Sequence, residues 1–417
     1  MNITVVCPHF SPDIAPTGEV MTTIAHGLVG LGHRLHVITA LPWYRHHAIE
    51  EGWGGRLVRH EETSWGGITR VHPFPTDKTN IPARALAFGG FTALAAGAGL
   101  AARRRHRPDV VLAMSPPLTL GPAAWLLARR WRVPMVFNVQ DVFPDVAVEL
   151  GVLRGQRAIA LARALERFVY RRADAVTVLS DDLAANVAGK LPVGEERAKV
   201  HVIPNFVDTE AISVGPKENG YRAHYGLGGR TVVMYAGNVG LSQSLGLLLH
   251  AARALADRRP DVTFVINGGG SARAGLEADA AGLANVAFID YQPKEMLGEV
   301  LGAADIHVVP LRTGLAHSSV PSKLYSVLAA GRPVLASVDA GTEVARTIER
   351  AGAGLAVAPD DPEAFLEALL ELLAEPVRLD QFGAAGRRFV EAWASPAAVA
   401  ESYSDLFAHL VKARDRG

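Results

Sequence analysis

Short apolar runs alternate with helical patterns along the whole chain. In the first half, six runs have the length and continuous apolar character of buried strands: NITVVCP, RLHVITA, DVVLAMS, PMVFNVQD, AVTVLS and VHVIPN. Helical patterns such as GEVMTTIAHGLVGLG and RAIALARALERFVYRRA lie between them. Apolar strands that alternate with helices predict a parallel sheet covered by helices on both faces.

The same rhythm restarts after a polar, glycine-containing stretch, SVGPKENGYRAHYG, which we interpret as a linker. The strands predicted after it are TVVMYAGN, VTFVINGGG, VAFIDY, ADIHVVPL, RPVLAS and GLAVAP. The pattern therefore predicts two Rossmann-like α/β domains, at residues 1–208 and 209–395. A ligand site is expected at the carboxyl ends of the strands, in a cleft between the domains. The last helix, 396–417, can cross back onto the first domain.

Composition limits the function classes. The 417 residues are 49% hydrophobic and 20% charged, which gives ample cores for two domains, and the zero net charge offers no argument for a nucleic-acid partner. The one cysteine, Cys7, lies in an apolar run and is expected to be a buried core residue. The absence of disulfides, of zinc-ligand spacing and of an N-terminal signal pattern favours a cytoplasmic protein.

Glycine-containing turns follow several of the predicted strands. One precedes a helix that starts near Gly18, one spans Gly237–Gly240, and one contains Gly268, Gly269 and Gly270. A further helix start lies in HSSVPSKLY, where hydroxyls and the ammonium of Lys323 come together. Backbone N–H groups at such positions bind anions. Because no GxGxxG is present, the turns predict a site for a diphosphate group other than that of a dinucleotide.

Several motifs make the chain resemble a known family. IPNFVD, VMYAGNVG, ADIHVVPL and LAAGRPVLAS occur in the order and spacing found in the retaining, metal-independent glycosyltransferases of family 4, which have the two-domain GT-B fold. VQDVFPDVAVELG, GNVGLSQ and VPSKLY are similar to the branch that includes bacterial O-antigen and colanic-acid enzymes. The resemblance covers nearly the whole chain.

The chain departs from this family at four positions. Most members have Arg and Lys where Asn238 and Gln243 stand, and two glutamates where Ser318 and Ser326 stand. Neutral side chains cannot balance a diphosphate, and serine cannot act as a bidentate carboxylate. Lys323 is therefore the expected phosphate-binding cation, with a solvated surface lysine as the alternative.

The resemblance implies a reaction and a set of site residues. The reaction is transfer, with retention, from a nucleotide sugar (UDP-sugar favoured over GDP-sugar) to a lipid-linked or saccharide acceptor in cell-surface polysaccharide or glycolipid biosynthesis, without a metal or cofactor. The candidate donor-binding residues are Gly18, Asn238, Gln243, Gly269, Tyr291, Ser318, Ser319, Val320, Pro321, Ser322, Lys323 and Ser326.

Asp141 and His9 are the candidate catalytic residues. Asp141 follows the strand PMVFNV, where the resemblance implies a polar residue near the donor sugar. Asp145 lies close by but is expected to cap a helix. His9 follows the first strand and has a purely structural role as its alternative.

One apolar stretch, Ala85–Ala102, is uncharged and precedes RRRHRP. Its many small residues favour a helix buried against the first sheet. The alternative is a surface-seeking helix whose basic end meets anionic lipid at the inner face of the plasma membrane.

Two other functions fit the fold class. A sugar-nucleotide epimerase would need cleft acids and histidines at other positions. A non-catalytic sugar-nucleotide-binding protein would account for the missing glutamates.

Overall fold

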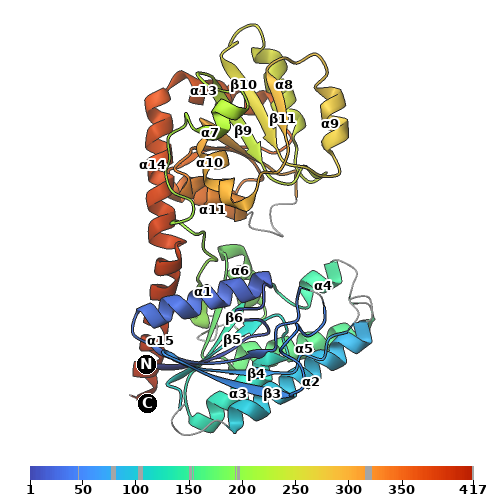
Figure 1. Cartoon of the computed structure of the whole chain (residues 1–417), viewed down its shortest axis with the longest axis vertical. Coiled ribbons are helices and arrows are strands. Elements are labelled where there is room, and N and C mark those ends of the chain that lie inside the picture. The colour runs from blue at the N-terminus through green and yellow to red at the C-terminus, as the bar shows by residue number, and fades with distance from the viewer. Residues whose placement is uncertain are drawn as a thin grey trace. The chain divides into compact units, whose positions relative to one another are not determined.

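A computed structural model describes residues 1–45, 47–76, 81–101, 107–149, 153, 155–192, 194, 198–314 and 322–415. The chain divides into two compact units (Figure 1). The first unit comprises Met1–Asn205 and Val399–Gly417, and the second comprises Phe206–Ala398. The division falls near the boundary predicted from sequence, after residue 208, and the end of the last helix belongs to the first unit.

The first unit contains an eight-stranded sheet of order β3-β4-β2-β1-β5-β6-β7-β8. Its strands are β1 (Asn2–Val6), β2 (Arg34–Ala40), β3 (Val58–Thr63), β4 (Gly66–Val71), β5 (Val110–Ser115), β6 (Met135–Val139), β7 (Ala175–Val178) and β8 (Val200–Val202). Its helices are α1 (Pro16–Gly30), α2 (Ile81–Leu100), α3 (Leu120–Trp131), α4 (Asp145–Glu149), α5 (Gln156–Arg172), α6 (Asp181–Gly189) and most of α15 (Pro396–Asp415). All strand pairs are parallel except β3 with β4.

The β3–β4 hairpin was not predicted from sequence. β3 is half-exposed and carries charges, while β4 is fully buried yet contains Arg70. Arg70 is 1% exposed and donates to Oε1 of Glu61 at 2.8 Å and to the carbonyl of Ser11 at 2.6 Å. The buried guanidinium therefore ties this hairpin to the loop after β1.

Helices α2, α3 and α5 cover one face of this sheet, with Phe91 and Ala95 of α2 in the core (Figure 1). Gly99 of α2 packs so closely that a Cβ there would lie 2.6 Å from a methyl carbon of Leu127 in α3. The described part of the stretch Ala85–Ala102, which lies in α2, thus packs against the sheet, the first of its two interpretations. No helix within the described residues combines the length and apolar character needed to cross a membrane.

Helix α15 packs on the opposite face of the first sheet. Tyr403 is 1% exposed, accepts from Nδ2 of Asn138 at 2.8 Å, and lies 3.2 Å from the hydroxyl of Thr177. Ser404 is bonded to Nε2 of His33 at 2.9 Å. The C-terminal helix is therefore an integral part of the first unit.

The second unit contains a fully parallel six-stranded sheet of order β11-β10-β9-β12-β13-β14. Its strands are β9 (Thr231–Ala236), β10 (Val262–Asn267), β11 (Val286–Ile289), β12 (Ile306–Pro310), β13 (Val334–Ser337) and β14 (Gly354–Val357). Its helices are α7 (Gly220–His224), α8 (Gly246–Leu255), α9 (Arg273–Asp279), α10 (Leu297–Gly302), α11 (Ser322–Ala329), α12 (Glu343–Ala351), α13 (Pro362–Ala374) and α14 (Pro376–Trp393). The two Rossmann-like sheets confirm the predicted α/β class.

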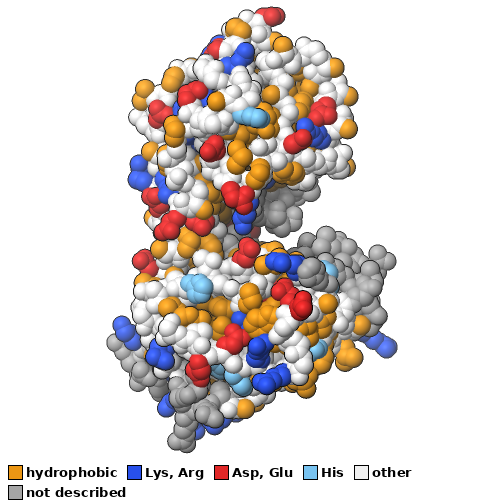
Figure 2. All heavy atoms as spheres, in the orientation of Figure 1, with side chains coloured by type: hydrophobic (Ala, Val, Ile, Leu, Met, Phe, Trp, Pro, Cys, Tyr) orange, Lys and Arg blue, Asp and Glu red, His pale blue; other side chains and the backbone are white. Residues whose placement is uncertain are grey.

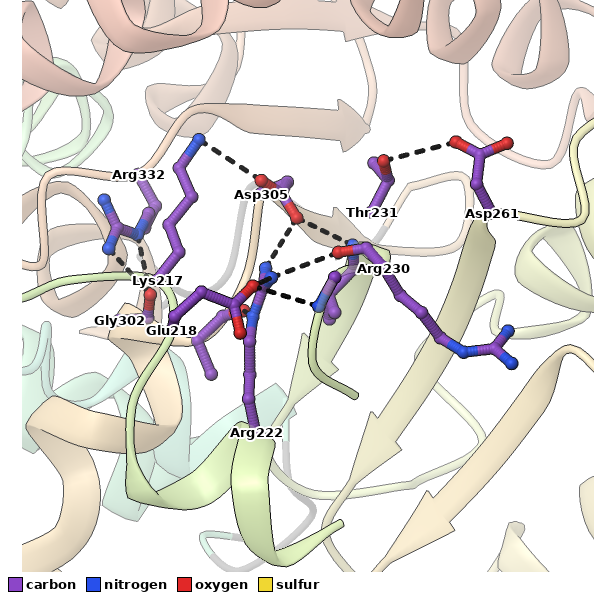
Figure 3. Close-up of polar contacts among 12 residues, drawn as sticks. Lys217, Glu218, Arg222, Arg230, Thr231, Asp261, Gly302, Asp305 and Arg332 are labelled. Atoms are coloured by element: carbon purple, nitrogen blue, oxygen red, sulfur yellow. Dashed lines mark hydrogen bonds and ion pairs between the residues drawn. The ribbon is translucent and has the colours of Figure 1, made fainter. Parts of the chain in front are cut away.

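The stretch predicted as a linker is instead part of the second unit (Figure 3). Arg222 of α7 is 2% exposed and donates to Oδ2 of Asp305 and Oε1 of Glu218, both at 2.6 Å. Arg332 donates to the carbonyl of Gly215 at 2.7 Å. Glycine and proline content suggested a linker, but buried arginines attach this segment to the amino ends of β9, β12 and β13. These amino ends lie at the opposite edge of the sheet from the carboxyl ends of the strands.

Candidate functional site

The second sheet has a topological switch point between β9 and β12. β9 pairs with β10 on one side and with β12 on the other, so the loops that leave β9 and β12 run to opposite sides. Such divergence leaves a crevice at the carboxyl ends of the strands, where ligands bind in open α/β sheets. The loops after Ala236 and Pro310 therefore flank the expected ligand site.

Three glycines lie in the loops that follow β9 and β10. Gly237, Gly268 and Gly270 have φ values of 143°, 144° and 155°. A Cβ on Gly268 would lie 1.9 Å from the carbonyl oxygen of Gly237. The loops after β9 and β10 are further joined by the hydrogen bond from the Val239 N–H to Gly269 O at 2.9 Å. Only glycine permits two backbones to approach in this way.

Lys323 of α11 brings its ammonium to the end of β9. Its Nζ donates to the hydroxyl of Tyr235 at 2.9 Å and lies 4.6 Å from the centre of that ring. The hydroxyl of Tyr235 in turn donates to the carbonyl of Asn238 at 2.5 Å. Burial lowers the pKa of Lys323 and raises that of Tyr235. A cation held in a partly desolvated place is stabilised by a bound anion.

The neutral residues of the β9–α8 loop have different surroundings. Oε1 of Gln243 accepts from the Gly240 N–H at 3.1 Å, so this side chain supports the loop. Asn238 is exposed, and its side chain lies beside Gly240 and Gly270. Tyr291 is 59% exposed and donates to the carbonyl of Gly269 at 3.3 Å. Ser326 lies in α11, one turn beyond Lys323, and is half-buried.

Five of the predicted donor-binding residues lie in the segment from Ser318 to Ser322. Ser318, Ser319, Val320 and Pro321 lie outside the described residues, and Ser322 is described only as the first residue of α11. Within the second unit, the structure thus brings together Asn238, Gln243, Gly269, Tyr291 and Lys323.

The loop after β12 is held by acids that the sequence analysis did not select. Asp360 accepts from the backbone N–H and the hydroxyl of Thr313 at 3.0 and 3.1 Å, and from the hydroxyl of Ser244. Asp339 accepts from the Gly314 N–H at 2.7 Å. The hydrogen bond from Ser244 is the main cause of a lowered pKa at Asp360. These contacts connect the loops after β9, β12, β13 and β14.

His9 lies in the first unit, in the loop after β1. Its Nδ1 is 2.7 Å from Oδ2 of Asp13, whose side chain is fully buried. Oδ1 of Asp13 accepts from the Tyr44 N–H at 3.1 Å, and the imidazole stacks on Trp43 with centroids 5.7 Å apart. Within the described residues the imidazole of His9 has no other hydrogen bond. Asp13 therefore orients the ring and leaves Nε2 available.

Gly18 supports His9. A Cβ on Gly18 would lie 2.8 Å from the Cβ of His9 and 3.3 Å from the carbonyl oxygen of Asp13. Gly18 is buried in the first turn of α1. Its small size therefore allows the helix to approach the loop that carries His9.

Asp141 is exposed and follows β6, two strands from β1 in the order β1-β5-β6. The neighbouring Gln140 is 8% exposed and bonds to Asn138 at 2.7 Å and to Asn205 at 2.9 Å. Asp145 is the first residue of α4. It was expected to cap this helix, but its carboxylate forms an ion pair with Lys190 at 2.7 Å. Asp141 is therefore exposed, whereas Asn138 and Gln140 are buried and Asp145 is half-buried.

No group of three or more His, Cys, Asp or Glu side chains within the described residues has a metal-binding arrangement.

Sequence comparisons assign this chain to a family. Residues 17–205 match the family described as glycosyl transferase 4-like domain, and residues 230–375 match the glycosyl transferases group 1. The chain is 30% identical over 278 residues to a protein of Pseudomonas aeruginosa named as a glycosyltransferase, WbjE, covering 66% of this chain and 68% of that one. The chain belongs to glycosyltransferase family 4.

A second relative matches over most of both lengths. It is an Escherichia coli K12 protein named as a colanic acid biosynthesis glycosyl transferase, WcaI, with 27% identity over 90% of this chain and 93% of that one. Among solved structures, HepE of Anabaena in complex with UDP has a TM-score of 0.64 and 14% identity, covering 98% of this chain and all of that chain (100%). These matches confirm the predicted GT-B glycosyltransferase fold.

Proposed function

We propose that this glycosyltransferase transfers a sugar, with retention, from a nucleotide sugar to a saccharide or lipid-linked acceptor in the synthesis of a cell-surface polysaccharide or glycolipid. The observation that carries the proposal is the position of Lys323, a partly buried cation at the switch point of the second sheet. The name of WcaI supports a role in polysaccharide synthesis. The complexes of HepE with UDP and with UDP-glucose support the choice of a UDP-sugar over a GDP-sugar.

In the proposed donor site, Lys323 pairs with the diphosphate. The N–H groups of the loops after β9 and β10 supply further donors, because Gly237, Gly268 and Gly269 let phosphate approach the backbone. Asn238 and Tyr291 are exposed at the same end of the sheet and contact the nucleotide or the sugar. Gln243 acts through the loop that it supports. Gly18 and the segment from Ser318 to Ser322 remain proposed donor contacts on the family resemblance alone.

Retaining transfer in this proposal requires positioning and charge stabilisation. The acceptor oxygen bonds to the anomeric carbon as the bond from that carbon to the diphosphate oxygen breaks, and the leaving phosphate receives the acceptor proton. Lys323 stabilises the developing phosphate charge, so no metal is required. Asp141 contacts the donor sugar or the acceptor hydroxyl, and His9, oriented by Asp13, provides a second polar contact.

An assay of nucleotide release tests this function. Purified protein is incubated with UDP-glucose or GDP-mannose, with and without a saccharide acceptor. Acceptor-dependent release of UDP, with NMR of the product giving the same anomeric configuration as the donor, is expected. Donor consumption that never requires an acceptor would favour an epimerase. Binding without turnover under all these conditions would favour a non-catalytic protein, and the inverted anomer would contradict retention.

The protein is proposed to act in the cytoplasm, at or near the inner face of the membrane if its acceptor is lipid-linked. It is proposed to need no cofactor and to bind no nucleic acid.

A further inference from the structure

Helices α3 and α5 carry a concentration of arginine that the proposed reaction does not use. The two helices lie side by side on the first sheet, with Trp125 edge-on to Phe168 at 5.4 Å between ring centres. Their arginines, with the residue that ends α3, are all exposed: Arg129, Arg130, Arg132, Arg157, Arg163, Arg167, Arg171 and Arg172. We call this surface the arginine face.

Acidic side chains do not balance this charge within the two helices. Their one carboxylate, Glu166, is 1% exposed and pairs with Lys190 at 2.6 Å. By contrast, arginines of the second unit commonly have acidic partners, as in Arg273 with Glu277 and Arg378 with Glu371. Figure 2 shows such interspersed charges on the visible face of that unit. The arginine face is therefore a concentrated positive surface on a chain whose net charge is zero.

Aromatic and apolar groups accompany the arginines. The guanidinium groups of Arg172 and Arg129 lie over the Trp125 ring at 5.4 and 5.7 Å from its centre. Leu126 is 42% exposed and Leu161 is 73% exposed. Between the arginines lies a surface hollow of about 280 Å³, lined by Ala164, Arg167, Phe168, Arg171 and Arg172. Guanidinium groups around an open hollow suit a phosphate head group, because they bind its oxygens in pairs.

We propose that the arginine face binds the surface of a bilayer rich in anionic phospholipid. The guanidinium groups contact lipid phosphates. Leu126, Leu161 and the edge of Trp125 enter the boundary between the lipid head groups and the acyl chains. Exposed leucines favour a bilayer over a nucleic acid, since a leucine gains nothing at a phosphodiester backbone. The role of this membrane binding rests on the proposed function, because it would bring the enzyme to a lipid-linked acceptor. The membrane binding itself is inferred from the charge pattern and does not depend on that function.

Vesicle cosedimentation with the full chain tests the proposal. Wild type is expected to bind vesicles of equal parts phosphatidylcholine and phosphatidylglycerol, and not vesicles of phosphatidylcholine alone. The double variant Arg163→Glu, Arg167→Glu should bind at least about 30-fold more weakly, the product of two arginine contributions. Neither arginine has an ion-pair partner among the described residues, so the fold should persist. The matched control is Arg258→Glu, Arg388→Glu, the same charge change at exposed positions of the second unit.

A second pair of variants tests insertion. Leu161→Ser should weaken binding to the anionic vesicles several-fold, whereas Leu241→Ser, at a residue with a similar exposure of 71% on the other unit, should not. Salt should weaken binding of wild type but leave the leucine difference in place.

Three results would overturn the proposal: no binding of wild type to anionic vesicles, equal binding by the two arginine double variants, or binding to single-stranded RNA but not to vesicles. Transfer to a soluble saccharide acceptor without vesicles separates this inference from the proposed function. The Arg163→Glu, Arg167→Glu variant should retain that transfer. If even wild type lacks it while vesicle binding behaves as expected, the proposed function fails and the membrane surface stands.

Discussion

The ammonium of Lys323 lies 2.9 Å from the hydroxyl oxygen of Tyr235, and that hydroxyl donates onward to the carbonyl of Asn238 at 2.5 Å. Helix α11, strand β9 and the loop after β9 are thereby connected through one phenol. The connection fixes a cation at the strand end where family 4 resemblance places the donor diphosphate.

The first prediction concerns this phenol. Tyr235→Phe removes the acceptor that positions Lys323 and the donor that satisfies Asn238 O, but it keeps the ring beneath the ammonium. We expect the KM for the nucleotide sugar to rise several-fold and the free energy of unfolding to fall by about 1 kcal/mol, the usual value of one hydrogen bond. Initial-rate kinetics and urea unfolding measure the two effects. An unchanged KM would show that the phenol supports only the fold.

The second prediction concerns pH. Burial lowers the pKa of Lys323 from its usual value of 10.5, and a bound diphosphate favours the charged form. Donor affinity should therefore be full at neutral pH and fall as pH rises through the lowered pKa of the free protein, before an ordinary lysine would titrate. Calorimetric titration of the donor across alkaline pH measures this. Lys323→Arg, which stays charged, should remove the fall; the same fall in that variant would assign it to another group.

The third prediction concerns Asp141, which is exposed after β6 and has a different environment from the paired Asp145. Asp141→Asn should keep donor affinity and lower turnover by ~10²–10⁴-fold, the range for a positioned acid–base or polar group. Rates are compared with calorimetry of the donor and with the melting temperature. Turnover within a few-fold of wild type, or a loss that follows a lower melting temperature, would remove Asp141 from the catalytic residues.

The fourth prediction concerns metals. Because Lys323 is proposed to neutralise the leaving diphosphate, EDTA should leave the transfer rate unchanged, and Mg²⁺ or Mn²⁺ should not increase it. Loss of turnover with EDTA that either metal restores would contradict a metal-independent reaction.

The sequence predicted the parallel sheets because their central strands are buried on both sides and are read as continuous apolar runs. It did not predict β3 and β4, since a half-exposed hairpin with Arg70 in its buried strand lacks that signal. It also took the stretch around Arg222 for a linker. There, ion pairs with residues distant in the chain, above all Asp305, outweigh local composition.

Part of the candidate site was similarly beyond sequence reasoning. Lys323 stood out because two basic residues expected in the family are absent. Tyr235 looked like an ordinary strand residue, and its role depends on α11 lying next to β9. Asp13 follows His9 by four residues, but a loop has no fixed side-chain period, so that spacing alone did not predict their 2.7 Å contact.

Donor calorimetry of Lys323→Ala tests the central claim most directly. The claim is that this one ammonium takes over the charge that Asn238 and Gln243 lack. Loss of a charge-assisted contact should weaken nucleotide-sugar binding by ~1.5–3 kcal/mol. Lys294→Ala, at an exposed lysine of the same unit, is the matched control and should bind as wild type does. Donor affinity in Lys323→Ala equal to that of the control would contradict the account.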